Sequence, residues 1–416
     1  MNPITSREFP VDNASILFLS LMRPYHSNNF RISVTLHEPV CPEALQKAVD
    51  RVTPRLPSVI ASLQPGFFHY RQVAVAQPPK VMPDPGLLHP PTREEMKESC
   101  FQVYYKDCTI SIEAFHAMTD GYGGLTTITT LVAEYLKERY GLEVPAGLTR
   151  LDPAQEPQAE EVSDDFLKMT DAPARHLPSR FSYLPTRSDN SDWQVRSHAV
   201  TINTRKLLEV AHRYGVTLNT LLTSVLASTV MDMQLKEKGN KGLKPVRIMV
   251  PVDLRRLVGS RTLRNFSLYT LPTMEVSQKD LPLEELCKVF GDQLKQQLSK
   301  ESLTSMVSYN VKSQTNPLFK IIPWKLKSAA LRFGYRFFGE SNSSLTLTNL
   351  GILKFPEEML PYIAEFRCWL TPRISSPYGC TVISFNDEVI LNMSYFGKED
   401  KVGNAFFKRL QEMVEA

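Results

Sequence analysis

The sequence predicts an α/β protein of two domains, built from mixed sheets with helices between the strands. Its 416 residues suffice for two domains, at roughly 100–200 residues each. Hydrophobic residues make up 42% and charged residues 22%, which is typical of a globular protein and excludes a disordered or fibrous chain. Segments with the two-residue apolar period of strands and the 3.6-residue period of helices occur in both halves.

The first predicted domain covers residues 1–150. Its pattern predicts a strand, a helix and a second strand, then an irregular proline-rich connection. Two strands with a turn at Lys106-Asp107 follow, and then a helix that Gly141 ends. These elements are expected at 31–36, 41–50, 67–73, 78–91, within 101–115, and at 125–136.

Residues 144–191 differ from their surroundings, because acidic residues are crowded among prolines and apolar periodicity is weak. We expect 151–191 to form a solvated crossover between the domains. An acidic docking segment is the alternative.

The second predicted domain covers residues 192–416 and again mixes strands with helices. We expect Asn386-Asp387 to form a turn between its last two strands. Strands are predicted at 198–202, 246–252, 344–347, 380–385 and 389–395, and helices at 204–214, from 217 or 219, and at 281–298 and 406–414.

The composition narrows the classes of function. Lys and Arg number 48 against 44 Asp and Glu, without the clustering of a nucleic-acid-binding surface. The six cysteines form no C-x-x-C pair, which favours reduced thiols in a cytoplasmic protein. The histidines lack metal-site spacing, and no apolar run approaches the roughly 20 residues of a membrane span. We therefore expect a soluble protein with neither a metal nor a bound cofactor.

One stretch, residues 109–124, carries a candidate for chemistry. His116 continues the apolar phase of the strand before it, so it is expected to face the same buried side. A neutral imidazole can take a proton from a hydroxyl or an amine at neutral pH. Asp120, in a turn that Gly121 permits, would hold the local geometry. The simpler interpretation is a structural histidine, with Asp120 capping the next helix.

His116, Asp120 and Gly121 form an H-x-x-x-D-G motif, which resembles that of the chloramphenicol-acetyltransferase-like superfamily. That group includes alcohol acetyltransferases, plant acyltransferases and condensation domains of peptide synthetases, and the bacterial alcohol acetyltransferase-like proteins are the most similar. Other segments resemble family blocks in the same order, so the likeness covers most of the chain. They are residues 9–14, 43–49 with 54–57, 250–255 with 264–266, and 348–351.

The resemblance implies two chloramphenicol-acetyltransferase-like domains flanking a central tunnel, with His116 midway along it as the general base. It also implies that Asp120 pairs with an arginine, for which Arg255 is the candidate and Arg256 the rival. Gly121 N–H, Thr348 and Asn349 are candidate oxyanion or tunnel groups, although ordinary loop structure explains each more simply. Residues that bind the donor stay unassigned.

The resemblance further implies an acyltransferase that uses acyl-coenzyme A as donor and a small molecule with a hydroxyl or amine as acceptor. Phe115 stands where condensation domains usually carry a second histidine, which favours coenzyme A over a carrier protein. Two alternatives stay open. One is a condensation or tailoring enzyme that works with an acyl carrier protein, and the other is a catalytically silent ligand-binding member of the fold.

Residues 317–339 mix apolar and basic side chains. An amphipathic helix packed on its own domain is the favoured interpretation. A peripheral membrane contact, or a cap over an apolar acceptor, is the alternative.

Overall fold

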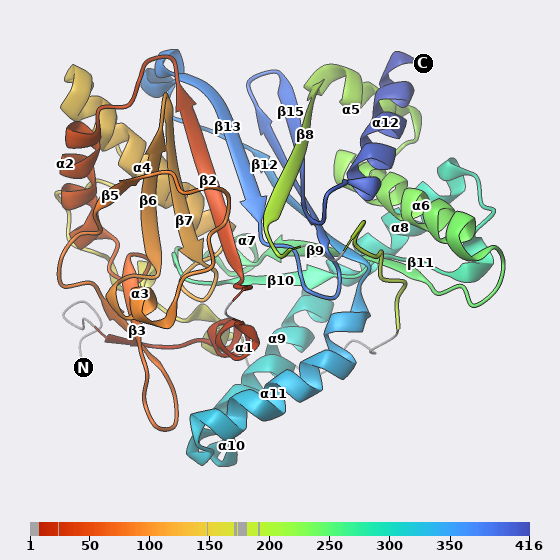
Figure 1. The fold of residues 1–416 in the computed structure, drawn as a ribbon, viewed down its shortest axis with the longest axis horizontal. Helices are drawn as coiled ribbons and strands as arrows, with labels where there is room; N and C mark the ends of the chain where they lie inside the picture. Colours follow the sequence, from red (N-terminus) through yellow and green to blue (C-terminus); the bar gives the residue numbers. More distant parts are fainter. Residues whose placement is uncertain (1–7, 24, 148, 170–172, 174–180, 190–191) are drawn as a thin grey trace.

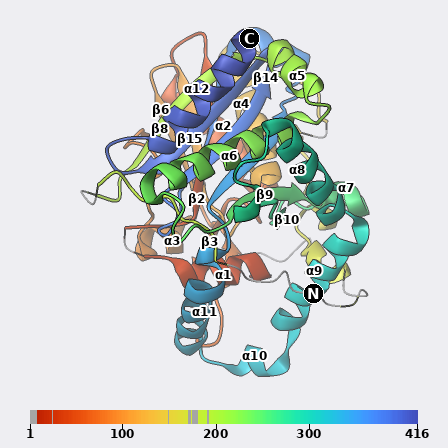
Figure 2. The same ribbon diagram turned by 90° about the vertical axis from the view of Figure 1, so that its right-hand side faces the viewer.

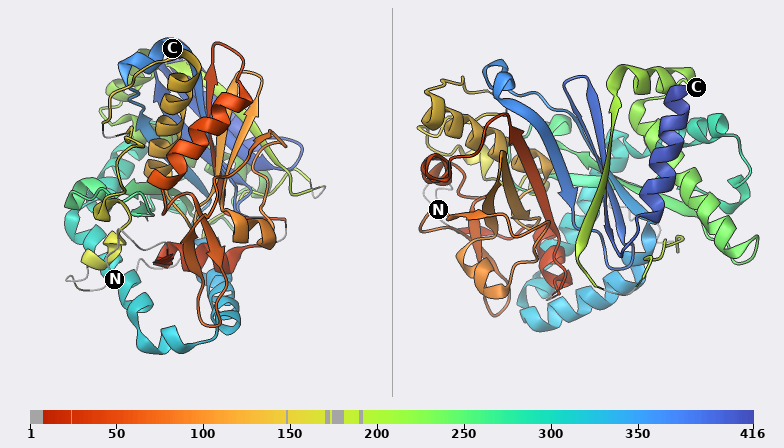
Figure 3. Two further views of the ribbon diagram at one scale, coloured as in Figure 1. Left: turned by 90° about the vertical axis from the view of Figure 1, so that its left-hand side faces the viewer. Right: turned by 45° about the horizontal axis from the view of Figure 1, so that its top comes forward.

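The computed structural model describes residues 8–23, 25–147, 149–169, 173, 181–189 and 192–416. Figure 1 shows two large sheets side by side, with helices packed on their outer faces. The two views of Figure 3 show these helices over the first sheet (left) and beside the second (right). The predicted α/β class with mixed sheets is confirmed.

The first sheet is five-stranded, in the order β13-β2-β7-β6-β5. β5 pairs with β6 in parallel, and the other neighbours are antiparallel. Helices α2 (Pro42–Val52) and α4 (Gly121–Tyr140) bury their apolar sides against one face, where Ile32 and Ile112 are fully buried. The strands are β2 (Asn29–Leu36), β5 (Val81–Pro83), β6 (Phe101–Lys106), β7 (Thr109–Phe115) and β13 (Ile363–Leu370).

The second sheet is seven-stranded, with the path β10-β9-β12-β14-β15-β8 and β11 beside β9. β12 runs parallel to β9 and β14. The second apolar core of the protein lies between this sheet and four helices, α5 (Thr204–Arg213), α6 (Leu218–Lys238), α8 (Leu283–Gln297) and α12 (Lys401–Glu415). The strands are β8 (Val195–Asn203), β9 (Val246–Asp253), β10 (Ser267–Thr270), β11 (Thr273–Met274), β12 (Leu345–Ile352), β14 (Tyr378–Phe385) and β15 (Glu388–Phe396).

Strand β13 joins the two sheets. It follows β12 in sequence, yet it pairs with β2 at the edge of the first sheet. Its Cys368 carbonyl oxygen accepts hydrogen bonds from Thr381 Oγ1 at 2.6 Å and Asn392 Nδ2 at 2.9 Å, both in the second sheet. The two predicted domains therefore share a strand.

A small third sheet and several helices complete the described fold. The sheet has the order β1-β4-β3. Helices α9 to α11 extend from one end of the molecule, as Figure 2 shows. The elements are β1 (Glu8–Pro10), β3 (Ala61–Gln64), β4 (Arg71–Ala74), α1 (Asn13–Leu21), α3 (Arg93–Glu98), α7 (Arg255–Val258), α9 (Lys300–Thr315), α10 (Pro317–Ile321) and α11 (Trp324–Phe338), with 3-10 turns at 53–55, 159–161, 165–168, 276–278, 340–342 and 357–362.

Three local predictions are wrong. The connection expected to be irregular at 78–91 contains the short strand β5, which pairs with β6 in parallel. The strand expected at 67–73 is the turn between β3 and β4 followed by β4, and Phe67 at the tip is 74% exposed. Pro65-Gly66 interrupts the extended chain there, so aromatic content indicated a strand where the backbone turns. The crossover is not simply solvated where it is described. Phe166 is buried, and Glu161 forms a buried ion pair with Arg55 at 2.7 Å. Parts of the crossover lie outside the described residues.

The face of the first sheet opposite its core carries a buried ionic cluster. Arg31 of β2 donates through Nε to Glu113 Oε1 of β7 at 2.8 Å, and its Nη atoms bind both oxygens of Asp84 at 2.8 Å. Leu88 N–H also donates to Glu113 Oε1, while Glu113 Oε2 is buried and has no hydrogen-bond partner among the described residues. Burial raises the pKa of Glu113 to about 7, although Arg31 lowers it. The folded state therefore favours a protonated Glu113.

This raised pKa predicts a pH-dependent stability. Since the folded state binds the proton more tightly than the unfolded chain, stability falls as pH rises from about 4.5 to about 7. The shift corresponds to about 3 kcal/mol at most. Glutamine does not titrate, so we expect Glu113→Gln to lose this part of the pH dependence, which amounts to at most one proton taken up or released on unfolding. Glutamine also keeps an acceptor for Leu88 N–H, so the local structure is expected to persist. Urea unfolding of both proteins at pH 5 and pH 8 measures the difference. An identical pH dependence in the variant would contradict this account.

Candidate active site

His116 comes directly after β7 and is half-buried. Its backbone N–H donates to the Asn28 carbonyl oxygen at 2.8 Å. Its ring centroid lies 4.9 Å from that of Phe18 in α1 and 5.3 Å from that of Phe30 in β2. The imidazole is thus held from two sides by aromatic rings, at the end of a strand whose own position the sheet fixes.

The partner of the imidazole is Asn265, which lies 149 residues further along the chain. His116 Nδ1 is 3.1 Å from Asn265 Oδ1. The other end of the amide, Nδ2, is 3.5 Å from Asp12 Oδ2, and a carboxylate can only accept from an amide NH₂. This orientation makes Asn265 Oδ1 an acceptor, so Nδ1 of His116 carries the hydrogen. Nε2 is then left with a free lone pair, as a general base requires.

Asp12 anchors this chain of contacts. Its carboxylate caps α1 by accepting from the backbone N–H of Ser15 at 2.7 Å, and it lies 3.8 Å from Arg264 Nη2. Burial, and then the negative charge of Asp12, raise the pKa of nearby Asp164 to about 6. Asp12 therefore acts as a fixed, buried support for the asparagine.

No role was predicted for Asn265 or Asp12 from the sequence. Both fall inside segments that resemble family blocks, 264–266 and 9–14, and this was the available signal. Neither residue is close to His116 in sequence, so only the tertiary fold reveals the contact.

Replacing Asn265 with alanine is expected to lower kcat about tenfold with little change in KM, since one orienting hydrogen bond is removed. The same change in a His116→Ala background is expected to have no further effect, because the two residues act as one unit. Steady-state kinetics of the single and double variants measures this coupling. Equal losses in both backgrounds would show that Asn265 acts independently of His116.

Asp120 is the N-cap of α4 and the centre of a buried ion pair. Its two oxygens accept from Arg255 Nη1 and Nη2, both at 2.9 Å. They also accept from the backbone N–H groups of Phe266 at 2.8 Å and Gly123 at 3.3 Å. All four lone-pair sites of the carboxylate are thus occupied. Both alternatives for Asp120 hold together, since it caps the helix and pairs with an arginine.

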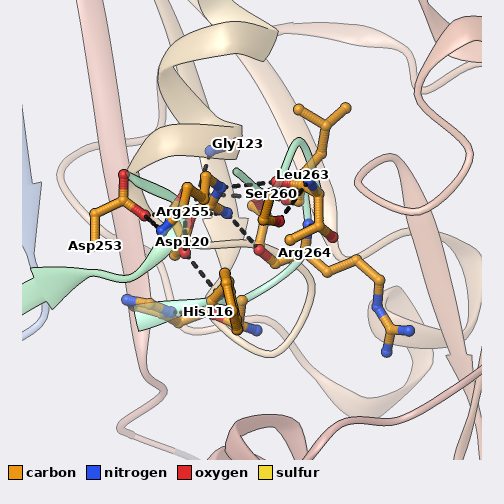
Figure 4. Close-up of polar contacts among 12 residues, drawn as sticks. His116, Asp120, Gly123, Asp253, Arg255, Ser260, Leu263 and Arg264 are labelled. Atoms are coloured by element: carbon orange, nitrogen blue, oxygen red, sulfur yellow. Dashed lines mark hydrogen bonds and ion pairs between the residues drawn. The ribbon is translucent and has the colours of Figure 1, made fainter. Parts of the chain in front are cut away.

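Arg255 uses all five of its N–H donors, as Figure 4 shows in part. Besides Asp120, it donates to Asp253 Oδ1 at 2.9 Å and to the carbonyl oxygens of Thr262 at 2.8 Å and Arg264 at 2.7 Å. Its guanidinium carbon lies 4.4 Å from the ring centroid of Tyr122. Arg256, the rival partner, is exposed. The pair ties the start of α4 to the 253–266 segment, and so to the neighbour of Asn265.

Gly121 of the motif and Gly123 beside it lie too close to other parts of the chain to carry a side chain. A Cβ on Gly123 would clash with the Leu263 carbonyl oxygen, a backbone atom that cannot turn aside. A Cβ on Gly121 would lie 2.8 Å from Leu350 Cδ2 in β12. Gly121 therefore lets β12 approach the start of α4, next to the ion pair.

Thr348 and Asn349 lie on β12, just before Leu350. Asn349 Oδ1 accepts from Gly351 N–H at 2.8 Å and so stabilises its own strand end. The Thr348 hydroxyl is buried and has no hydrogen-bond partner in the part of the chain that the structure describes. Of the two, Thr348 is the one whose side chain makes no hydrogen bond to the described residues.

The described residues contain no group of three or more His, Cys, Asp or Glu placed to hold a metal ion. All six cysteines are free, and four of them are buried. Burial raises the pKa of the Cys368 thiol to about 12. That residue is therefore a poor nucleophile at neutral pH.

Comparison with known proteins supports the fold. No protein-family model and no curated protein matches the sequence. The structure is similar to a trichothecene 15-O-acetyltransferase, TRI3 of Fusarium sporotrichioides, with a TM-score of 0.61 and 11% identity over 98% of this chain and 95% of that one. It is similar to F. sporotrichioides TRI101, solved with coenzyme A and T-2, with a TM-score of 0.60 and 13% identity over 97% of both chains.

The first condensation domain of the calcium-dependent antibiotic synthetase is also similar, with a TM-score of 0.60 and 12% identity over 99% of this chain and 97% of that one. The resemblance drawn from the sequence is thereby confirmed for the fold, because acetyltransferases and condensation domains share it with this chain over nearly its whole length.

Proposed function

We propose that this protein is an acyltransferase that moves an acyl group from a coenzyme A thioester to a hydroxyl or an amine, with His116 as general base. The observation that supports this most is the contact from Asn265 Oδ1 to His116 Nδ1, which leaves Nε2 free to take a proton. The likeness to an acetyltransferase and to a protein solved with coenzyme A supports the reaction class and the donor.

In the proposed reaction, His116 Nε2 removes the proton from the acceptor O–H or N–H as that atom attacks the thioester carbonyl carbon. The tetrahedral oxyanion collapses and the C–S bond breaks. The leaving thiolate takes the proton back from Nε2, giving an ester or amide and free coenzyme A. The thioester supplies the activation. The carbonyl carbon and the sulfur keep their oxidation states throughout.

The oxyanion needs a hydrogen-bond donor in this scheme. The Thr348 hydroxyl suits the role better than Asn349, because the oxygen of Asn349 is already engaged with Gly351. Asp120 and Arg255 serve as positioning residues, since the acceptor sites of the carboxylate and the N–H donors of the guanidinium are all used within the protein.

A carrier-protein thioester is the second candidate donor, and the likeness to a condensation domain supports it. The acceptor and the chemistry of His116 would be unchanged. The two candidates differ only in what presents the acyl group.

Thiol release from acetyl-, butyryl- and longer acyl-coenzyme A, with mixed alcohols and amines, tests the proposal. We expect release that depends on the acceptor. No release with any coenzyme A donor, but transfer from an acylated carrier, would favour the second candidate. Binding of acyl-coenzyme A without turnover under all conditions would identify a silent member and refute the proposed reaction.

A further inference from the structure

The end of the molecule formed by α10, α11 and the β3–β4 turn carries seven of the 17 large hydrophobic side chains that are exposed in the described residues. Figure 1 shows α10 and α11 at the lower edge, beside the orange loop of that turn. We call the exposed side chains of residues 67–68 and 318–333 the arm surface. Its large apolar members are Phe67, Phe68, Leu318, Ile321, Ile322, Leu326 and Phe333.

The arm surface is a single, supported unit. Trp324 N–H donates to the Phe67 carbonyl oxygen at 2.8 Å, and Lys327 Nζ donates to that of Phe68 at 3.1 Å. The rings of Tyr70 and Trp324 lie 5.1 Å apart beneath it. Segments more than 250 residues apart are therefore joined so that both present apolar side chains outward. Large apolar patches of this kind on a folded protein mark an interaction site.

The segment that carries most of the arm surface is positively charged. Residues 302–339 contain six Lys and Arg and no Asp or Glu. The rest of the chain holds 42 Lys and Arg against 44 Asp and Glu, so the basic excess of the protein resides in this segment. Lys320 and Lys325 are exposed among the apolar side chains, and Lys312 is exposed on the neighbouring α9.

We propose that the arm surface docks on an anionic lipid membrane. Apolar side chains enter the boundary between headgroups and acyl chains, while lysines meet the anionic headgroups. The absence of carboxylates over 38 residues removes the repulsion that an anionic surface would otherwise meet. Four of the seven large apolar side chains are aliphatic and offer nothing for bases to stack on, which favours a lipid surface over a nucleic acid.

The expected mode is peripheral. Within the described residues no single helix is long and apolar enough to cross a membrane, and only the sharply bent pair α5 and α6 reaches that length and composition together. Helix α11, which carries part of the arm surface, contacts helix α1 of the candidate active site. Arg332 Nε of α11 donates to the Ser20 carbonyl oxygen of α1 at 2.7 Å, and α1 carries Phe18, whose ring lies against His116.

Vesicle flotation of the full chain tests the proposal. The probes are phosphatidylcholine vesicles with about 30% phosphatidylglycerol, and vesicles of phosphatidylcholine alone. We expect binding to the first to be at least about tenfold stronger, and to weaken in high salt. Phe67→Ser with Phe333→Ser is expected to lower it about tenfold or more. Lys320→Glu with Lys325→Glu is expected to lower the binding to anionic vesicles at least fivefold for each lysine replaced.

Two matched controls guard against a general loss of structure. Ile352→Ser replaces an apolar residue of β12 that is 72% exposed, close to the 68% of Phe333. Lys408→Glu reverses a charge on α12 whose side chain is 77% exposed. Both are expected to bind anionic vesicles like the wild type.

Three results would overturn the proposal: equal binding to both kinds of vesicle or to neither, an equal loss in the control variants, or arm variants that instead abolish self-association or binding of an acidic carrier protein. Sedimentation at the assay concentration detects the self-association. Lipid binding needs no substrate, so its failure leaves the proposed acyl transfer untouched.

Discussion

Replacing Asp120 with alanine is expected to destabilise the protein by roughly 3–5 kcal/mol. The side chains of Asp120 and Arg255 are only 4% and 5% exposed, so the guanidinium would stay buried opposite an empty site. The change also removes the acceptor for two backbone N–H groups, those of Gly123 and Phe266. Thermal and urea unfolding measure the loss.

Asp253→Ala is the matched control, because Asp253 binds the same arginine through a side chain that is 43% exposed. We expect it to cost about 1 kcal/mol or less, as exposed pairs do. Asp120→Asn, which keeps a cap oxygen, is expected to fall between the two. An Asp120→Ala variant that melts like the wild type would show that the ion pair does not hold the site together.

Replacing His116 with alanine is expected to lower kcat/KM by about 10² to 10⁴, the usual contribution of a positioned general base. Glutamine at this position keeps a polar side chain but cannot accept a proton at neutral pH, so His116→Gln is expected to be as inactive. Both variants are expected to unfold close to the wild-type midpoint, since the half-buried ring makes one side-chain hydrogen bond.

His212→Ala serves as the control for this prediction. That histidine lies on the exposed side of α5 and is expected to be dispensable for activity. A His116→Ala protein that is folded and turns over at the wild-type rate would remove His116 from the mechanism.

Local patterns predicted the elements next to the motif well. The hairpin of β6 and β7 and the helix α4 lie where apolar periodicity, the Lys106-Asp107 turn and Gly141 indicated. Gly141 adopts a φ of +70°, which suits glycine at a helix end. Such features depend on residues within a few positions of each other, so a single sequence contains them.

Strand β13 could not be predicted from local patterns. Its pairing with β2 shifts register between Ile363 and Glu365, so the apolar residues do not keep a strict two-residue period. Its neighbour is also more than 320 residues away in sequence. Nothing local identifies that partner.

The site shows the same division. The motif itself indicated His116 and Asp120, and the family block indicated Arg255 but not its choice over Arg256. That choice depends on α7, whose turn buries Arg255 and exposes Arg256. The contact between Asn265 and His116 depends on the packing of both sheets, and no pattern in the sequence encodes it.

The central claim is that His116 activates the acceptor for direct attack on the thioester, without acylation of the protein. Mixing excess enzyme with an active acyl donor, first without and then with acceptor, tests this by thiol release and intact mass. We predict an unmodified protein and no thiol until the acceptor is added. A stoichiometric burst of thiol before that addition, with an acyl group on the protein, would contradict the account.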